Sequence, residues 1–170
     1  MTIVFFGAAA VVLYIIAGYP LLLAALARRR PPAGTAASFR PAAVTILVPV
    51  RNGELWLRSK LESLLAQEYP RELVRIMVIS DGSTDRTNAI ASEFLKYGVE
   101  LVDIPRSGKA AALNAGIERA TGQVLLFTDV RQPLHPASLR NMVSRFADPS
   151  VGAVSGHIVF QGAGHKDSPH

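Results

Sequence analysis

"VRIMVISDGSTD", residues 74–85, is the segment that most clearly indicates the class of fold. Its first part is rich in β-branched and other apolar side chains, which predicts a buried strand over 74–80. The polar residues 81–85 then form a turn that ends in good N-cap residues for a helix. A largely apolar strand that leads through a short turn into a helix is typical of a parallel sheet covered on both faces.

The same alternation extends to both sides of this stretch. It predicts an α/β fold with a mainly parallel sheet and flanking helices, because each helix returns the chain to the start of a new parallel strand. The further strands are expected at 44–48, 99–104, 124–127 and 151–160, and the helices at 55–65, 86–97, 109–120 and 136–146.

Residues 3–27 contain no charged side chain. At about 1.5 Å per residue this run is long enough for a hydrocarbon core of about 30 Å. No Lys or Arg precedes it and it is too long for a signal peptide core, which argues against cleavage. Arg28, Arg29 and Arg30 follow it, so the positive-inside rule predicts a single-pass helix in the inner or plasma membrane, with the rest of the chain cytoplasmic.

We therefore divide the chain into an anchor with its arginine cluster at 1–30, a linker at 31–43 and a globular part at 44–170. The linker is rich in Pro, Ala and Gly and lacks hydrophobic periodicity. The net charge is +5, but much of the excess comes from the arginine cluster and no basic stripe interleaved with aromatics is present. The composition therefore does not favour a nucleic-acid partner. The chain has no cysteine, which excludes disulfides and thiolate metal sites.

Polar residues gather where the first four predicted strands end. The four segments are "PVRNGE" (49–54), "DGSTD" (81–85), "PRSGK" (105–109) and "TDVRQ" (128–132). In parallel sheets ligands bind beyond the carboxyl ends of the strands. We therefore expect the four segments to rim one edge of the sheet and to form one binding site there.

This rim has the chemistry of a diphosphate site. Gly108 precedes a predicted helix, and helix N-termini present N–H groups and a positive dipole end to anions. Lys109 adds a positive charge at the same place, and Asp129 offers an oxygen ligand to Mg²⁺ or Mn²⁺. These cations usually take one or two protein carboxylates and complete their shell with water and phosphate oxygens. A metal-bridged diphosphate fits these parts.

Two other nucleotide motifs are excluded. A P-loop needs Ser or Thr after its lysine and a glycine five residues before its Gly-Lys pair, but these positions hold Ala110 and Asp103. No G-x-G-x-x-G segment follows any predicted strand, which argues against a dinucleotide oxidoreductase.

Four segments in order resemble family 2 glycosyltransferases. They are "ILVPVRNGE" (46–54), "VISDGSTDRT" (78–87) and the continuous run "GKAAALNAGIERATGQVLLFTD" (108–129), which carries the last two. They are most similar to membrane-anchored bacterial enzymes that build polysaccharides from UDP-sugars. The resemblance implies an incomplete GT-A fold over about 44–160 and an inverting, metal-dependent transfer from a nucleotide-sugar to the hydroxyl of a glycan or lipid-linked acceptor.

The resemblance also implies roles for single residues. Asn52, Glu54 and Asp81 match positions that hold the uridine of the donor. Lys109 matches the lysine next to the diphosphate, and Asn114 matches the asparagine of the following helix.

At the fourth loop the match is only partial. Asp129 matches the first acid of the family's D-x-D metal motif, whereas Arg131 stands where the second acid would be. An arginine cannot ligate a metal, but its guanidinium can bind a phosphate directly. We therefore predict weaker metal dependence than two carboxylates would give.

No general base is identified. An inverting transfer needs one, and the resemblance implies that it lies beyond the segment matched here. Asp167 is a poor candidate because it is close to the chain terminus. The sequence thus predicts the donor-binding half of a truncated glycosyltransferase, with a possible partner chain that supplies the rest. The alternative is a non-catalytic, membrane-anchored module that binds a nucleotide or a partner.

Overall fold

The structure is a computed structural model, and it describes residues 1–28 and 40–159. The chain divides into two compact units, Met1–Ala37 and Ser38–His170, which are described separately. Most of the predicted linker, together with Arg29, Arg30 and the tail that contains Asp167, lies outside the described residues.

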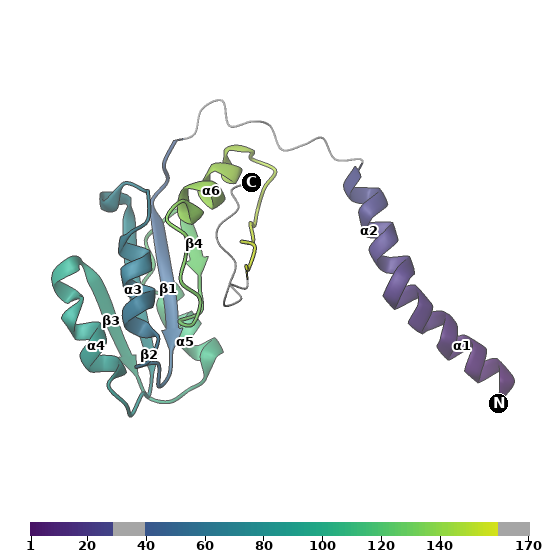
Figure 1. Cartoon of the computed structure of the whole chain (residues 1–170), viewed down its shortest axis with the longest axis horizontal. Helices are drawn as coiled ribbons and strands as arrows, with labels where there is room; N and C mark the ends of the chain where they lie inside the picture. The colour runs from purple at the N-terminus through teal and green to yellow at the C-terminus, as the bar shows by residue number, and fades with distance from the viewer. Residues whose placement is uncertain (29–39, 160–170) are drawn as a thin grey trace, which may run out of the picture. The chain divides into compact units, whose positions relative to one another are not determined.

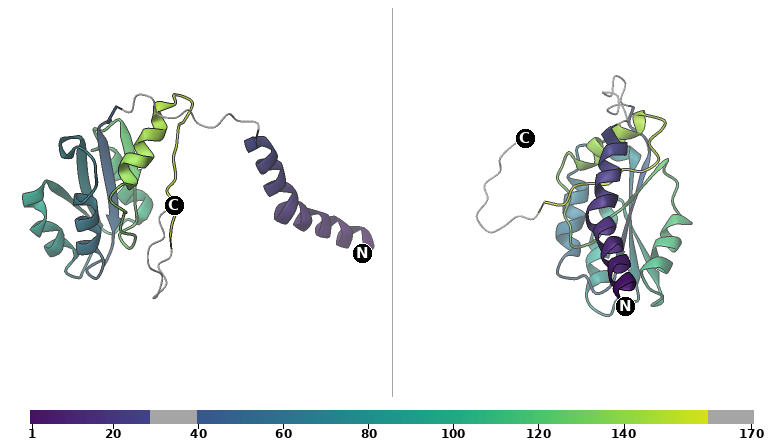
Figure 2. Two further views of the ribbon diagram at one scale, coloured as in Figure 1. Left: turned by 45° about the horizontal axis from the view of Figure 1, so that its top comes forward. Right: turned by 90° about the vertical axis from the view of Figure 1, so that its right-hand side faces the viewer.

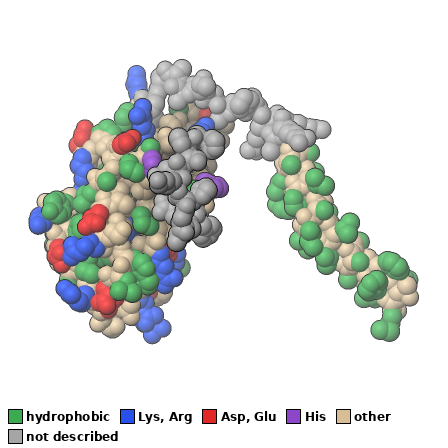
Figure 3. Space-filling view, in the orientation of Figure 1, with side chains coloured by type: hydrophobic (Ala, Val, Ile, Leu, Met, Phe, Trp, Pro, Cys, Tyr) green, Lys and Arg blue, Asp and Glu red, His purple; other side chains and the backbone are tan. Residues whose placement is uncertain are grey.

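The first unit is a long apolar helix. It consists of α1 (Thr2–Leu13), a π-helical turn (η1, Tyr14–Gly18) and α2 (Tyr19–Arg28). The widened turn ends two residues before Pro20, which has no backbone N–H to donate a helical hydrogen bond, and the helix bends between α1 and α2 (Figure 2). Thr2–Leu26 has 25 residues and a mean hydropathy of 2.3, so this helix is long and apolar enough to cross a membrane. None of its side chains is buried. Hydrophobic side chains cover the face seen in Figure 3.

The second unit is built on a parallel sheet of four strands (Figure 1). The strands are β1 (Val44–Val50), β2 (Val74–Asp81), β3 (Val99–Ile104) and β4 (Val124–Phe127), in the order β3-β2-β1-β4. All three pairings are parallel, as the alternating sequence pattern predicts.

Helices cover both faces of this sheet (Figure 1). Residues of α3, α4 and α6 form a core with one face, and α5 packs on the other. Short 3₁₀ turns, η2, η3 and η4, precede β2 or extend α4 and α6. The bounds are α3 Leu57–Leu65, α4 Thr87–Glu93, α5 Lys109–Ile117, α6 Ser138–Ser144, η2 Arg71–Leu73, η3 Leu95–Tyr97 and η4 Arg145–Ala147.

The central strands are apolar on both faces because both faces are covered. Along β1, Ile46 and Val48 belong to the core on the side of α3, whereas Leu47 belongs to the core that contains Ala112 of α5. The fold thus confirms the predicted α/β arrangement of a parallel sheet with flanking helices.

The predicted fifth strand is wrong. Residues 151–159, the described part of that segment, form no strand, and they pair with no strand of the sheet. Gly152 and Gly156 interrupt the apolar pattern, and glycine weakens a strand because it brings backbone entropy and no side chain to pack. The segment instead passes beside α6 and β4, where Val151 and Val154 help to line a cavity of about 620 Å³.

Candidate functional site

The ends of the four strands bring four loops to one edge of the sheet, at the bottom of the second unit in Figure 1. Parallel strands that run in the same direction must end on the same side, so the segments after Val50, Asp81, Ile104 and Phe127 become neighbours. The prediction that these polar segments share one edge is confirmed by this topology. The hydrogen bonds between the loops show how each is held.

The loops after β1 and β2 are held together by Asn52 and Glu54. Asn52 Oδ1 accepts a hydrogen bond from the Thr84 N–H (2.9 Å), and Glu54 Oε2 accepts one from the Arg86 N–H (3.0 Å). The Glu54 N–H in turn donates to Asp85 Oδ2 (3.1 Å). Asn52 has a φ of 49°, a left-handed conformation that asparagine tolerates better than most residues. Both side chains thus fix the shape of the rim, and their contact with a nucleoside stays a prediction.

Asp85 is the acid that organises the second loop. Burial alone would raise its pKa, but hydrogen bonds from the Thr87 hydroxyl, the Thr87 N–H and the Glu54 N–H outweigh burial and lower the pKa below its ordinary value. Thr87 Oγ1 also accepts the Gly53 N–H (2.8 Å). The carboxylate therefore stays ionised at neutral pH and holds the start of α4 against the loop after β1.

Asp81 holds the start of α5. The residue is only 6% exposed. Its carboxylate accepts hydrogen bonds from the N–H groups of Ser107 (2.6 Å) and Gly108 (3.0 Å to Oδ2). The Gly108 N–H, which the sequence predicts as part of an anion cradle, is therefore bonded to Asp81. Gly82 makes this approach possible: its φ is +59°, and a Cβ there would lie 2.8 Å from the Arg106 nitrogen.

Lys109 and Asp129 face each other across the rim. Lys109 Nζ lies 3.7 Å from Asp129 Oδ2, and the two side chains are 68% and 41% exposed. Asp129 Oδ1 accepts the Arg131 N–H (2.9 Å), which fixes the carboxylate within its own loop. Such an exposed pair contributes little to stability, but both charges are open to a ligand. The structure thus brings Asp81, Lys109 and Asp129 to one region, around the start of α5.

The side chain of Arg131 points to the loop after β1. Its guanidinium carbon lies 4.8 Å from the centre of the Trp56 ring, a cation–π contact that links the fourth loop to the first. No motif in the sequence marks Trp56 as part of this edge. The predicted contact between Arg131 and a phosphate stays a prediction.

Asn114 is the most distant of the predicted residues along α5. It is exposed, and it lies more than one helical turn after Lys109. Within the described parts of the chain, no hydrogen bond joins its side chain to the rim loops. Its role stays a prediction.

Lys60 is the functional candidate that sequence reasoning missed. It lies on α3 with no exposed surface, on the same face as the buried Leu57, Leu61 and Leu64. Its Nζ donates to Thr128 Oγ1 (2.6 Å) and to the Gln132 carbonyl oxygen (2.5 Å). One feature of the sequence could have indicated this burial: Lys60 lies three residues after Leu57, on the apolar side of the helix where a core residue is normally found.

The environment of Lys60 changes its protonation. Burial lowers its pKa from 10.5 to about 8, although the nearby Asp129 carboxylate opposes this shift. The ammonium form therefore still predominates at neutral pH, where it can donate to both oxygens.

The donor set at the rim fits a metal only in part. Asp129 is one suitable oxygen ligand, but the described residues contain no group of three or more His, Asp or Glu side chains that could hold an ion. Mg²⁺ and Mn²⁺ often bind through one or two carboxylates together with substrate phosphates. Asp129 thus fits a cation that is shared with a ligand's phosphates, and does not fit a cation held by protein alone.

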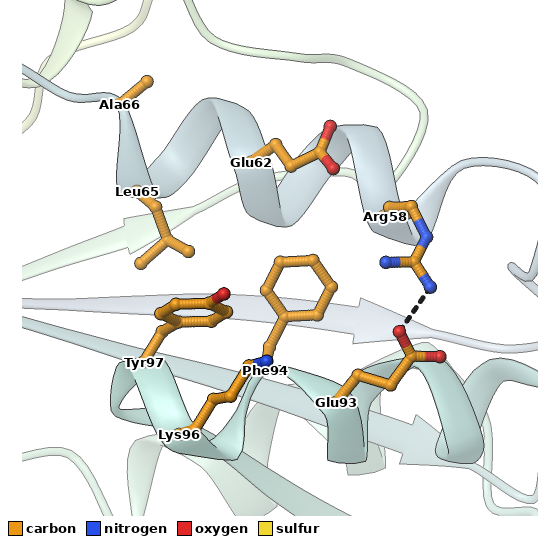
Figure 4. A pocket seen from close by; sticks show the side chains of 8 residues that line it. All are labelled: Arg58, Glu62, Leu65, Ala66, Glu93, Phe94, Lys96 and Tyr97. Carbon is orange, nitrogen blue, oxygen red and sulfur yellow. Dashed lines mark hydrogen bonds and ion pairs between the residues drawn. The ribbon is translucent and has the colours of Figure 1, made fainter.

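A separate groove lies between α3 and η3, and Figure 4 shows its lining residues. It has a volume of about 460 Å³, and the Arg58–Glu93 ion pair (2.6 Å) crosses its rim. Phe94 and Tyr97 form its apolar floor. None of the predicted site residues lines it, so this groove is distinct from the edge of the sheet.

Two known proteins to which the chain is similar are named as a glycosyltransferase and a sugar-polymer synthase. The chain is 31% identical over 120 residues to glycosyltransferase AglE of Haloferax volcanii, a match that covers 69% of this chain and 40% of AglE. It is 32% identical over 117 residues to a poly-beta-1,6-N-acetyl-D-glucosamine synthase of Staphylococcus epidermidis, covering 67% of this chain and 28% of the synthase. The chain therefore spans less than half the length of these relatives.

A solved mannosyltransferase structure shares the fold, which confirms the predicted GT-A arrangement. The mannosyltransferase PcManGT from Pyrobaculum calidifontis, in complex with GDP-Man and Mn²⁺, superposes with a TM-score of 0.71 and 30% identity, over 85% of this chain and 44% of that one. The family model described as "Glycosyl transferase family 2" matches residues 45–170, which include all of the sheet except Val44 and all four rim loops. On the agreement of this match with the relatives and the fold, the chain belongs to glycosyl transferase family 2.

Proposed function

We propose that this chain is the donor-binding part of a membrane-anchored glycosyltransferase. In this proposal a nucleoside diphosphate sugar binds at the carboxyl edge of the sheet, and its sugar passes to a hydroxyl group of a glycan or lipid-linked acceptor. The observation that carries the proposal is the exposed Lys109–Asp129 pair at the start of α5. It combines a cation for phosphate with an oxygen ligand for a metal.

The diphosphate is proposed to bind between these two side chains. Lys109 would contact phosphate oxygens directly, and Arg131 would add a second cation if it left Trp56. Asp129 would hold Mg²⁺ or Mn²⁺ together with the phosphates, and the cation would supply positive charge that stabilises the departing diphosphate. GDP-Man and Mn²⁺ in the PcManGT complex support this donor class.

The nucleoside is proposed to lie against the first two loops. Asn52 and Glu54 bind backbone N–H groups of the second loop, so in this proposal they shape the pocket and contact the base with their remaining atoms. Asp81 is buried and accepts hydrogen bonds from the residues that lead into α5, which supports a role for it in the floor of the proposed nucleoside site. We retain uridine as the predicted base and test it against guanosine.

Binding to the full chain in detergent micelles tests the proposal. Titration calorimetry with UDP and GDP, each with and without Mn²⁺, is expected to show binding of one nucleotide that strengthens with Mn²⁺. Asp129→Asn should weaken the Mn²⁺-dependent binding at least about tenfold, because a neutral amide is a poorer metal ligand. Glu118→Gln, an exposed acid at the other end of α5, is the matched control.

Absence of binding by both nucleotides would overturn the proposal. So would binding that is equally tight with and without Mn²⁺ in both the wild-type protein and Asp129→Asn. Incubation with UDP- and GDP-sugars then separates the two candidate functions. Transfer to an acceptor supports the enzyme, whereas binding without transfer or hydrolysis supports the non-catalytic module.

The membrane anchor has its own test. We propose that the helix over Thr2–Leu26 spans the inner membrane once and leaves the second unit in the cytoplasm. Because the chain has no cysteine, Ser59→Cys on the exposed side of α3 gives a single labelling site. A membrane-impermeant maleimide should label it only after the cells are opened. Labelling of intact cells, or release of the protein by alkaline carbonate, would contradict this topology.

A further inference from the structure

Lys60 is the only lysine among the fully buried side chains of the described residues. A buried ammonium is costly unless strong hydrogen bonds replace its hydration. Its two acceptors, Thr128 Oγ1 and the Gln132 carbonyl, are 68 and 72 residues away along the chain. The bonds therefore do not serve α3 itself, and they connect this helix to a distant loop.

The two acceptors are the first and last residues of the loop 128–132. This loop contains Asp129 and Arg131, the two charged residues that the fourth strand brings to the rim. Lys60 thus bonds both ends of the loop and leaves the two functional side chains on the outside.

Val130, at the centre of the loop, packs into the hydrophobic core, but the other polar contacts between the loop and the domain are few. The Thr128 N–H continues the sheet by donating to the Leu47 carbonyl (3.2 Å), and the Gln132 N–H makes a long bond to the Asp129 carbonyl (3.4 Å). The two short bonds from Lys60 are therefore the main polar connection between the loop and the body of the domain, in the part of the chain that the structure describes.

The same helix supports the loop from a second side. Trp56 immediately precedes α3, one turn before Lys60, and its ring carries the guanidinium of Arg131. Trp56 and Lys60 together tie the loop after β4 to the helix that follows β1, so that α3 sets the distance between the first and fourth loops.

We propose that Lys60 is a positioning residue for donor binding, which fixes the Asp129 carboxylate by bonding Thr128 and Gln132 at the two ends of its loop. The proposal rests on the proposed function, since it assigns Lys60 to the site at which Asp129 would share a metal with the donor diphosphate. It makes no contact between Lys60 and the donor: the residue acts through the loop.

Lys60→Met is the principal test, because methionine keeps the length and volume of the side chain and removes the two bonds. The substitution removes the desolvation cost of the ammonium, but it also leaves the Thr128 hydroxyl and the Gln132 carbonyl without their donor, which is destabilising. Because the two effects oppose each other, we expect the midpoint of urea unfolding to shift little. Under conditions in which the variant is fully folded, its Mn²⁺-dependent affinity for UDP or GDP should fall at least about tenfold. A purely structural role would not weaken binding in the folded protein. Lys96→Met, an exposed lysine on η3, is the matched control.

The loop itself can be observed without any nucleotide. The chain has a single tryptophan, Trp56, so its fluorescence reports on the cover that Arg131 provides. In the full chain, Lys60→Met should raise the acrylamide quenching constant of this tryptophan, whereas Lys96→Met should leave it unchanged. This measurement remains decisive for the hold on the loop if the wild-type protein binds neither nucleotide, which would defeat the proposed function separately.

Thr128→Val provides an independent variant that keeps the lysine and removes one acceptor. It should shift the quenching constant and the affinity in the same direction as Lys60→Met, and it decides the question if Lys60→Met does not fold. Wild-type quenching in the folded variants would overturn the proposal. Wild-type affinity for the metal-bound nucleotide in those variants would do the same.

Discussion

Two helices meet the loop that carries Asp129, and they contact it in opposite ways. From α3, the buried Lys60 bonds the two ends of the loop at 2.5–2.6 Å. From the start of α5, the exposed Lys109 faces the carboxylate of Asp129 itself at 3.7 Å. The difference separates two tasks: a cation removed from water can hold backbone and hydroxyl oxygens in place, whereas a cation left in water stays available to a ligand.

The environment of each lysine explains the division. Burial disfavours the charge of Lys60, so the short bonds to Thr128 and Gln132 are needed to keep the ammonium in the core. Solvent screens the attraction between Lys109 and Asp129, so this pair can separate at little cost when phosphate and a metal arrive. Changes at buried contacts should therefore alter stability more than changes at exposed ones.

The pH dependence of stability should identify the buried lysine. The pKa of Lys60 is lowered from 10.5 to about 8, so between these values the unfolded chain holds a proton that the folded chain lacks. Stability due to Lys60 should therefore rise with pH through this window, by at most about 3 kcal/mol. The measurement is the difference in free energy of unfolding between the wild-type protein and Lys60→Met at several pH values from 7 to 11. A constant difference across the window would show that Lys60 titrates normally.

Removal of Asp81 should destabilise the start of α5. Asp81→Ala leaves the N–H groups of Ser107 and Gly108 without their buried acceptor, at a cost of about 2 kcal/mol. Urea unfolding followed by circular dichroism measures this loss. Asp81→Asn, which keeps one acceptor oxygen, should recover part of it, and equal stability of all three proteins would show that water replaces the carboxylate.

Lys109→Met should separate stability from binding. The exposed pair with Asp129 contributes no more than about 1 kcal/mol, so thermal unfolding should change little. The affinity for Mn²⁺-nucleotide should fall, and its dependence on salt should become weaker because one phosphate contact is lost. If the binding isotherm is unchanged at low and high salt, Lys109 does not contact the diphosphate.

The smallest effect is expected for the contact between Arg131 and Trp56. Arg131→Gln removes a partly exposed cation–π contact of about 0.5 kcal/mol. The emission and quenching of Trp56 should change although the unfolding midpoint barely moves. Arg131→Lys, which keeps the charge without the flat guanidinium, is the control for geometry, and a Trp56 signal identical in all three proteins would mean that the stacking is absent in solution.

The strands of the fold could be predicted from the sequence where a continuous apolar run marks them. The runs at 44–48 and 74–80 are strands because both faces of a covered parallel sheet demand largely apolar residues. The run at 151–160 is also largely apolar, apart from Gly152 and Gly156, but it is not a strand in its described part. A strand needs a neighbour to receive its hydrogen bonds, and a composition pattern does not show whether that neighbour is present.

The sequence predicts where the rim residues lie, but it does not predict which hydrogen bonds connect the rim loops. Chain direction alone puts Asp81, Lys109 and Asp129 at one edge, since parallel strands end together. That Asp81 bonds the start of α5 depends on the close approach of Gly82 to Arg106, which lies in a different loop. Local sequence cannot give such a distance.

Local patterns in the sequence predict the succession of the four strands and their helices, the apolar helix at the N-terminus and the edge at which charged residues collect. These features follow from hydrophobic periodicity and chain direction, so they can be predicted without knowing which elements pack together. The burial of Lys60 and its bonds to the loop of Asp129 are visible only in the folded structure. A lysine is normally solvated, and its burial is stable only where oxygens from far along the chain converge on it.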